Sequence, residues 1–132
     1  MNYSDVDTPA VLIDMAVTGS NIKNYQNYCD ENGLKLRPHI KTHKIPELAK
    51  LQLAAGAIGI TCQKVSEAEA MLSEGGIDDI LITYNIYGYS KLQRLLQLST
   101  RCNLSVVADN SVCVKGLSET FKKQDKPLQV LV

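Results

Sequence analysis

The chain has 132 residues, of which 45% are hydrophobic and 21% charged, values typical of a globular domain with a core of its own. Fourteen lysines and arginines balance fourteen acidic residues and only 5% of residues are aromatic, which argues against a nucleic-acid-binding surface. No apolar run reaches membrane-spanning length, and the first ten residues lack the basic-then-apolar layout of a signal peptide. We therefore expect a cytoplasmic protein with no membrane partner. The four cysteines show no close paired spacing, which predicts reduced, buried thiols rather than a zinc site.

Apolar periodicity and turn residues predict an alternation of strands and helices along the chain. An apolar run at 10–13 precedes a first helix, which Thr18 or Ser20 is predicted to cap and Gly33 to end. The segment 34–40 alternates as a strand does. Further helices are predicted over 46–55, from Val65 or Ser66 to Gly75, over 90–100 and through Leu117 and Phe121, and further strands over 58–62, 80–83, 104–108 and 128–132.

The spacing between the predicted strands, 20 to 25 residues, is that of βαβ units, so the sheet is expected to be parallel. Two α/β architectures remain open at this point: an open doubly wound sheet and part of a (β/α)8 barrel. The sequence contains neither the G-x-G-x-x-G pattern of dinucleotide-binding folds nor a P-loop.

The stretch RPHIKTHK, at 37–44, contains both histidines of the chain and three further basic side chains, Arg37, Lys41 and Lys44. In the segment 34–41 the even positions are apolar and the odd positions basic: Leu34, Leu36, Pro38 and Ile40 alternate with Lys35, Arg37, His39 and Lys41. Parallel strands covered by helices are normally apolar on both faces, so a charged face indicates a functional cavity. In a barrel the basic face would point to the axis, with Lys41 at the carboxyl end of its strand, where barrel active sites lie.

Polar residues also follow the next three predicted strands. We expect one rim to carry Lys41, Gln63, Asn85 and Asp109, and the helices to cover Leu34, Leu36 and Ile40.

The basic stretch allows four interpretations. His39 and His43 have the spacing of metal ligands on a helix, but Pro38 argues against a helix there. A solvated basic face and a phosphate clamp are also compatible with its composition. The fourth is a nucleophilic lysine: cations nearby lower the pKa of an amine and free it for Schiff-base formation. The candidate neighbours of Lys41 for that effect are Lys35, Arg37 and Lys44.

Four stretches, DTPAVLIDM, LRPHIKTHK, GAIGITCQKVSEAEAM and GIDDILITYN, resemble the N-terminal barrel of pyridoxal-phosphate enzymes of the alanine racemase type. Within that family the chain is most similar to the D-threonine aldolase and D-serine dehydratase branch. The resemblance implies that Lys41 carries pyridoxal phosphate as a Schiff base. It also implies cofactor contacts for the residues that share its face or rim, namely Arg37, His39, Gln63 and Asn85.

The resemblance implies a lyase that performs retro-aldol cleavage of a D-3-hydroxy amino acid such as D-threonine or D-3-hydroxyaspartate. The stretch CQKVSEAE is more similar to the aldolases than to the dehydratases. Members of the family also use a divalent metal, whose ligands would lie outside this chain. The alternatives are a D-serine dehydratase, an amino-acid racemase, a non-catalytic pyridoxal-phosphate-binding protein, and a Schiff-base aldolase acting on sugar phosphates without a cofactor.

The length bears on the domain organisation. A (β/α)8 barrel takes about 250 residues, so residues 1–132 are expected to be the N-terminal part of one, an incomplete barrel of about five strands. The rest of the barrel and a β-domain would be absent. An open sheet edge favours association, so we expect a homo-oligomer, and we expect the 132 residues alone to bind cofactor weakly and to lack turnover.

Overall fold

The computed structural model describes residues 2–132 and alternates helices with strands, as predicted. The helices are α1 (Met15–Glu31), α2 (Pro46–Ala55), α3 (Val65–Leu72), α4 (Tyr89–Ser99) and α5 (Ser111–Phe121), with short 3-10 turns η1 (Tyr3–Asp5) and η2 (Ile40–Thr42). The strands are β1 (Ile60–Cys62), β2 (Asp79–Ile82), β3 (Asn103–Val107) and β4 (Gln129–Leu131).

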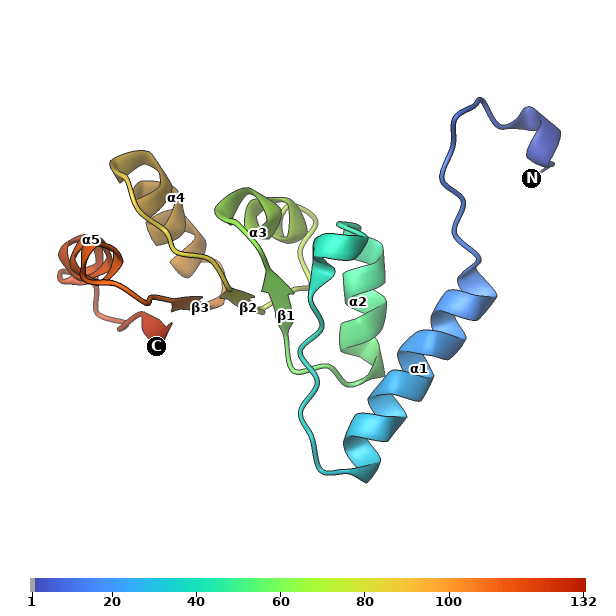
Figure 1. Cartoon of the computed structure of the whole chain (residues 1–132), viewed down its shortest axis with the longest axis horizontal. Helices are drawn as coiled ribbons and strands as arrows, with labels where there is room; N and C mark the ends of the chain where they lie inside the picture. The colour runs from blue at the N-terminus through green and yellow to red at the C-terminus, as the bar shows by residue number, and fades with distance from the viewer. Residues whose placement is uncertain (1) are drawn as a thin grey trace.

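The four strands form one parallel sheet in the order β1-β2-β3-β4, so each strand pairs with the next one along the chain. The register places Ile80 beside both Ile60 and Leu104. Each connection contains a helix, as parallel pairing requires. Figure 1 shows the helices following one another along one side of the curved row of strands. This arrangement confirms the predicted α/β fold with a parallel sheet.

The two faces of the sheet differ in chemistry. The helix-covered face is apolar and buried, and it is formed by Ile60, Cys62, Ile80, Ile82, Leu104 and Val106. The opposite face carries Thr61, Leu81, Ser105 and Val107, a mixture of polar and half-buried apolar residues. Barrel strands have this division, with one face under the helices and the other toward the axis. Within residues 2–132, no helix has both the length and the apolar composition that crossing a bilayer requires.

The predicted strand over 34–40 is present as an extended segment rather than as a regular strand. The Ile58 N–H donates to the Leu36 carbonyl (2.9 Å), and the Thr61 N–H donates to the Pro38 carbonyl (2.8 Å). An isolated parallel bridge joins His39 to Thr61. Pro38 has no N–H to donate, which limits a regular ladder here. The segment therefore lies parallel to β1 in the place of a fifth strand, before β1.

Three predicted positions in this region had different outcomes. Ile40 is completely buried, as expected, although it begins the turn η2 instead of ending a strand. Leu36 is half-buried. The prediction that Leu34 lies under a helix is wrong, because its side chain is 54% exposed. The Leu34 N–H still bonds to the Cys29 carbonyl in the turn that ends α1, so the extended segment starts only after it.

The start of α1 also differs from the prediction. Asp14 caps the helix, and its Oδ1 accepts hydrogen bonds from the N–H groups of Ala16 (2.9 Å) and Val17 (3.0 Å). Thr18 and Ser20 lie inside the helix, because the cap comes four residues earlier than the first predicted one. The end was predicted correctly: Gly33 adopts the left-handed conformation, with φ 65°. Residues 10–13, which precede α1, form neither helix nor strand. They belong to the N-terminal segment that projects from the rest of the chain in Figure 1.

Candidate active site

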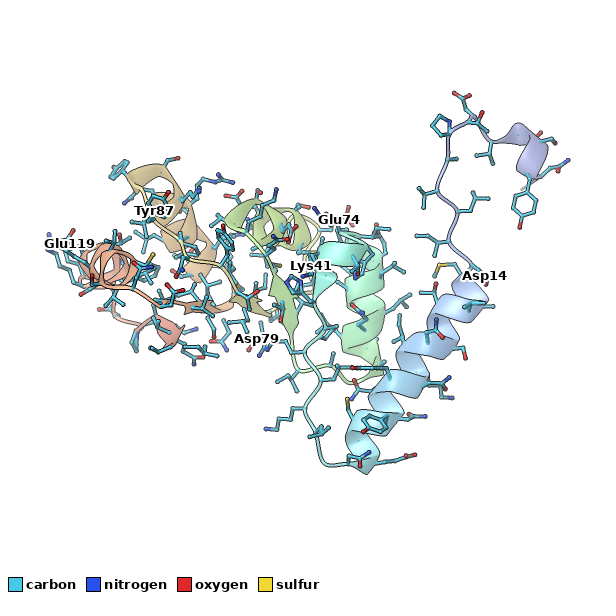
Figure 2. All side chains as sticks on the ribbon, viewed as in Figure 1. Asp14, Lys41, Glu74, Asp79, Tyr87 and Glu119 are labelled. Atoms are coloured by element: carbon cyan, nitrogen blue, oxygen red, sulfur yellow. The ribbon has the colours of Figure 1, made fainter. Side chains whose placement is uncertain are left out.

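Lys41 lies in η2, immediately after the extended segment, at the carboxyl end of the parallel segments. Its side chain is exposed, and no residue in the range 2–132 forms a hydrogen bond or ion pair with its Nζ. Figure 2 shows Lys41 near the upper end of β1 and Asp79 well below it. The structure thus places an unpaired amine at the end of the sheet where the sequence predicted it.

A compact turn holds Lys41. The N–H groups of His43 (3.2 Å) and Lys44 (2.8 Å) both donate to the Ile40 carbonyl, and His39 Nδ1 accepts a hydrogen bond from the Lys41 N–H (3.3 Å). Lys44 has φ 54°, the only positive φ of a residue other than glycine within 2–132. A left-handed lysine is energetically unfavourable in isolation, so contacts of this residue must stabilise the turn.

Both histidines lie in or beside this turn, and both are partly buried. Burial, followed by the positive charge of Lys41, lowers the pKa of His39, while the carboxylate of Glu67 acts in the opposite direction. Burial also lowers the pKa of His43, whose Nδ1 accepts a hydrogen bond from the Ile45 N–H (3.0 Å). A neutral His39 that accepts at Nδ1 carries its proton on Nε2.

The metal interpretation of these histidines has no geometric support. His39 and His43 do not share a helix, and the Nδ1 atoms of both already accept backbone hydrogen bonds. Within the described part of the chain, no group of three or more histidine, cysteine or acidic side chains is placed to hold a metal ion.

The other predicted rim residues follow β1, β2 and β3 at the same end of the sheet. Asn85 Nδ2 donates to Asp109 Oδ1 (2.7 Å), which ties the end of β2 to the end of β3. The hydrogen bonds from Asn110 and from Asn85 lower the pKa of Asp109. The Oδ1 atom of Asn85 is buried without a partner among residues 2–132. Gln63 and Asn85 line a cavity of about 290 Å³, but no hydrogen bond within the described range joins either of them to Lys41.

Arg37 lies at the opposite end of the sheet. Its Nη1 donates to Asp79 Oδ1 (2.5 Å), at the first residue of β2. The other carboxylate oxygen of Asp79 accepts from Asn103 Nδ2 (2.7 Å), and Asn103 Oδ1 accepts from Lys126 Nζ (3.2 Å). A Cβ on Gly59 would lie 2.3 Å from Arg37 Nη1, so a residue without a side chain leaves room for the guanidinium. We call Arg37, Asp79, Asn103 and Lys126 the amino-end network.

The sequence analysis missed Glu67, the third residue of α3. This carboxylate is 5% exposed; its Oε2 accepts from the Gln63 N–H (2.8 Å), and its Oε1 lies 3.2 Å from Lys44 Nζ. Burial, the largest influence, acts to raise the pKa of Glu67, but the Gln63 hydrogen bond and Lys44 outweigh it, and the pKa is lowered. A glutamate in the first turn of a predicted helix is a recognisable capping signal and could have pointed to it. Two of the three expected cationic neighbours of Lys41, Arg37 and Lys44, therefore have carboxylate partners of their own.

Comparisons with known proteins agree with this geometry. Residues 13–132 match the family model "Alanine racemase, N-terminal domain". The chain is 41% identical to the D-threonine aldolase of Arthrobacter sp. over 127 residues, which cover 96% of this chain and 33% of that protein. It is 34% identical over 128 residues to the D-threo-3-hydroxyaspartate dehydratase of Delftia sp., again covering 96% of this chain and 33% of that protein.

The solved structures give the same picture. The crystal structure of D-threonine aldolase from Filomicrobium marinum superposes with a TM-score of 0.92 at 38% identity, covering 98% of this chain and 35% of that one. The chain spans about a third of the length of the curated relatives it matches.

Proposed function

Because the chain belongs to the alanine racemase N-terminal domain family, we propose that it supplies the cofactor-binding rim of a pyridoxal-phosphate-dependent lyase that cleaves D-3-hydroxy amino acids. The observation that carries the proposal is the unpaired Lys41 amine at the carboxyl end of the parallel segments. The similarity to an aldolase at 41% identity favours retro-aldol cleavage, with D-threonine or D-3-hydroxyaspartate as substrate.

The donor groups at this rim fit pyridoxal phosphate. Lys41 offers a primary amine for the aldehyde, and the neutral His39 offers an Nε2–H donor beside it. The buried Oδ1 of Asn85 lacks a hydrogen-bond donor within the range 2–132, so a bound ligand could supply one. Gln63 adds a second amide at the end of β1. We propose that these residues hold the cofactor, with Lys41 as the covalent attachment point.

When bound, pyridoxal phosphate supplies an electron sink for the electron pair of the broken Cα–Cβ bond. The chain's own residues would bind the cofactor and orient it at the rim. Lys41 would hold the cofactor through its amine, and His39 would offer its Nε2–H as a hydrogen-bond donor at the rim. A cofactor role for Arg37 stays a prediction, and its pairing with Asp79 gives this residue a structural function as well. A divalent metal would need ligands outside residues 2–132, since no cluster of three donors lies within them.

Reductive trapping tests the attachment point. The protein is incubated with pyridoxal phosphate and treated with borohydride, which reduces the carbon–nitrogen bond that a lysine amine and the aldehyde form with loss of water. Peptide mass mapping should place the label on Lys41, and a Lys41→Ala variant should lose it. Label found mainly on Lys35 or Lys44, or equal labelling of the Lys41→Ala variant, contradicts the proposal.

A dehydratase is the second candidate, favoured by the 34% identity to the D-threo-3-hydroxyaspartate dehydratase. The products separate the two reactions. Cleavage of D-threonine yields glycine and acetaldehyde, whereas dehydration yields a keto acid and ammonia. Cofactor labelling without consumption of any D-amino acid would instead indicate a non-catalytic binding protein, and consumption with inversion at Cα a racemase.

The domain organisation is also a proposal. The relatives carry about two thirds of their length outside the matched region, and we propose that an equivalent part completes the barrel and adds the β-domain. Residues 1–132 without that part should bind cofactor weakly and lack turnover. Four free cysteines suit a reducing cytoplasm, and the exposed sheet edges suit a homo-oligomer.

A further inference from the structure

Glu67 is the only buried charged side chain within residues 2–132. A buried carboxylate without partners carries a large desolvation cost, so its contacts show what it does in the structure. Its two oxygens contact different elements: Oε2 accepts from the Gln63 N–H at the end of β1, and Oε1 faces Lys44 Nζ in the turn that contains Lys41.

The contact with Gln63 alone would make Glu67 a capping residue of α3. A carboxylate in the first helical turn satisfies a free N–H group and lies favourably in the helix dipole. The contact with Lys44 is not needed for that role. It connects α3 to residue 44, the residue with the left-handed backbone that closes the turn.

Lys41 and Lys44 are the two lysines of the turn formed by residues 41–44 (KTHK). They are three positions apart, and both are exposed. They differ in their partners: Lys44 Nζ lies 3.2 Å from Glu67 Oε1, whereas Lys41 Nζ has no partner among residues 2–132. The form of lysine that attacks an aldehyde is the neutral, unpaired amine. An ion pair therefore makes one of these two lysines a poorer nucleophile than the other.

We propose that Glu67 is a positioning residue that selects Lys41 over Lys44 for attachment of the cofactor. It holds the Lys44 ammonium in an ion pair and, through the same contact, fixes the turn that presents Lys41 at the rim. This inference rests on the proposed function, since it concerns the lysine that pyridoxal phosphate uses.

The test measures how borohydride-trapped pyridoxal phosphate is distributed between Lys41 and Lys44. Glu67→Gln keeps an oxygen that can accept from the Gln63 N–H but removes the charge that pairs with Lys44. We expect this variant to label Lys41 about fivefold more slowly, as for loss of an ion pair whose lysine is exposed, and to gain label on Lys44. Glu69→Gln is the matched control: Glu69 lies in the same helix, is also ion-paired, and its partner Arg94 belongs to α4. It should label as the wild type does.

Lys44 variants separate positioning from simple folding. Lys44→Arg keeps a cation and should retain the wild-type rate on Lys41, whereas Lys44→Gln should slow it as Glu67→Gln does. If Glu67→Gln fails to fold, the two Lys44 variants decide the matter, since Lys44 is exposed. Glu67→Gln and Lys44→Gln remove the same ion pair, so the double variant should slow the labelling of Lys41 no more than either single variant does.

The outcomes also separate the two proposals. A wild-type protein that does not label Lys41 overturns the proposed function itself. A wild type labelled on Lys41, with Glu67→Gln or Lys44→Gln labelled at the same rate and on the same lysine, overturns the selection by Glu67 alone.

Discussion

Both ends of the sheet carry charged and amide side chains, but the two ends differ in whether these side chains have partners within the chain. At the amino end, Arg37 and Asp79 pair with each other, and Asn103 and Lys126 extend the network. At the carboxyl end Glu67 pairs with Lys44 and Asn85 Nδ2 bonds to Asp109, but within residues 2–132 Lys41 Nζ and Asn85 Oδ1 have no partners. Four positions along one extended segment separate Arg37 from Lys41. Charges satisfied within the chain stabilise the fold, while unpaired groups are available to a ligand, so partner contacts distinguish the two ends better than composition does.

Gly59→Ala should have the largest effect on this contrast. The new Cβ would lie 2.3 Å from Arg37 Nη1 and 2.8 Å from the Asp79 carbonyl oxygen, so the guanidinium must leave its partner. Overpacking and a weakened charged hydrogen bond together should lower the free energy of unfolding by about 3 kcal/mol. Urea denaturation measures this loss.

Gly19→Ala is the control for that experiment. Gly19 lies in α1, and no neighbouring atom lies within 4 Å of the position that a Cβ would occupy there. Alanine there should raise the free energy of unfolding by about 1 kcal/mol, because it favours the helix. Two glycine-to-alanine changes with the same sign would contradict the steric role of Gly59.

Asp79→Asn should have an intermediate effect. The substitution removes the charge that faces Arg37, whose side chain is 22% exposed, and disturbs the contact with Asn103. We expect a loss of about 2 kcal/mol in unfolding free energy, with labelling of Lys41 by pyridoxal phosphate unchanged. Asp78→Asn, at the neighbouring exposed carboxylate, should stay within about 0.5 kcal/mol of the wild type. Lost labelling with unchanged stability would instead assign the amino-end network to cofactor binding.

The smallest expected effect is a pH dependence that reports on the carboxyl end, because both histidines of the chain lie there. The pKa values of His39 and His43 are lowered in the folded protein, mainly by burial. As pH falls through about 6.5, the unfolded chain binds protons first, so stability should decrease until the pH passes below the folded pKa values. Urea midpoints at pH 7.5, 6.5 and 5.5 should fall in that order. A variant with both histidines changed to asparagine should show a weaker dependence of the urea midpoint on pH. Midpoints that rise as the pH falls would contradict the predicted loss of stability.

The sequence predicted the parts of the fold that depend on local periodicity. The predicted helix over 46–55 has the bounds of α2, and all strand pairs are parallel as expected. Alternation also identified the face that Arg37 shares with His39, but it could not give the direction of a long side chain along the strand. The contact between Arg37 and Asp79 spans 42 positions and depends on the space above Gly59.

The pairing of Glu67 with Lys44 was beyond the sequence for a similar reason. Lys44 lies in a turn where its backbone is left-handed, a conformation that a lysine does not adopt by preference, so local sequence does not predict where its side chain lies. The cap at Asp14 was missed because several capping residues follow one another near the start of α1, and local sequence does not rank them.

The strand order β1-β2-β3-β4 has a consequence for biosynthesis. Every strand pairs with its successor, and the partners lie close in sequence, as in Ile60 with Ile80 and Ile80 with Leu104. Pairings between consecutive strands cost less loop-closure entropy than pairings between strands farther apart in the sequence. Each strand–helix unit can therefore dock on the preceding one as the chain emerges from the ribosome, so the turn with Lys41 and the helix with Glu67 can meet before the later strands join the sheet.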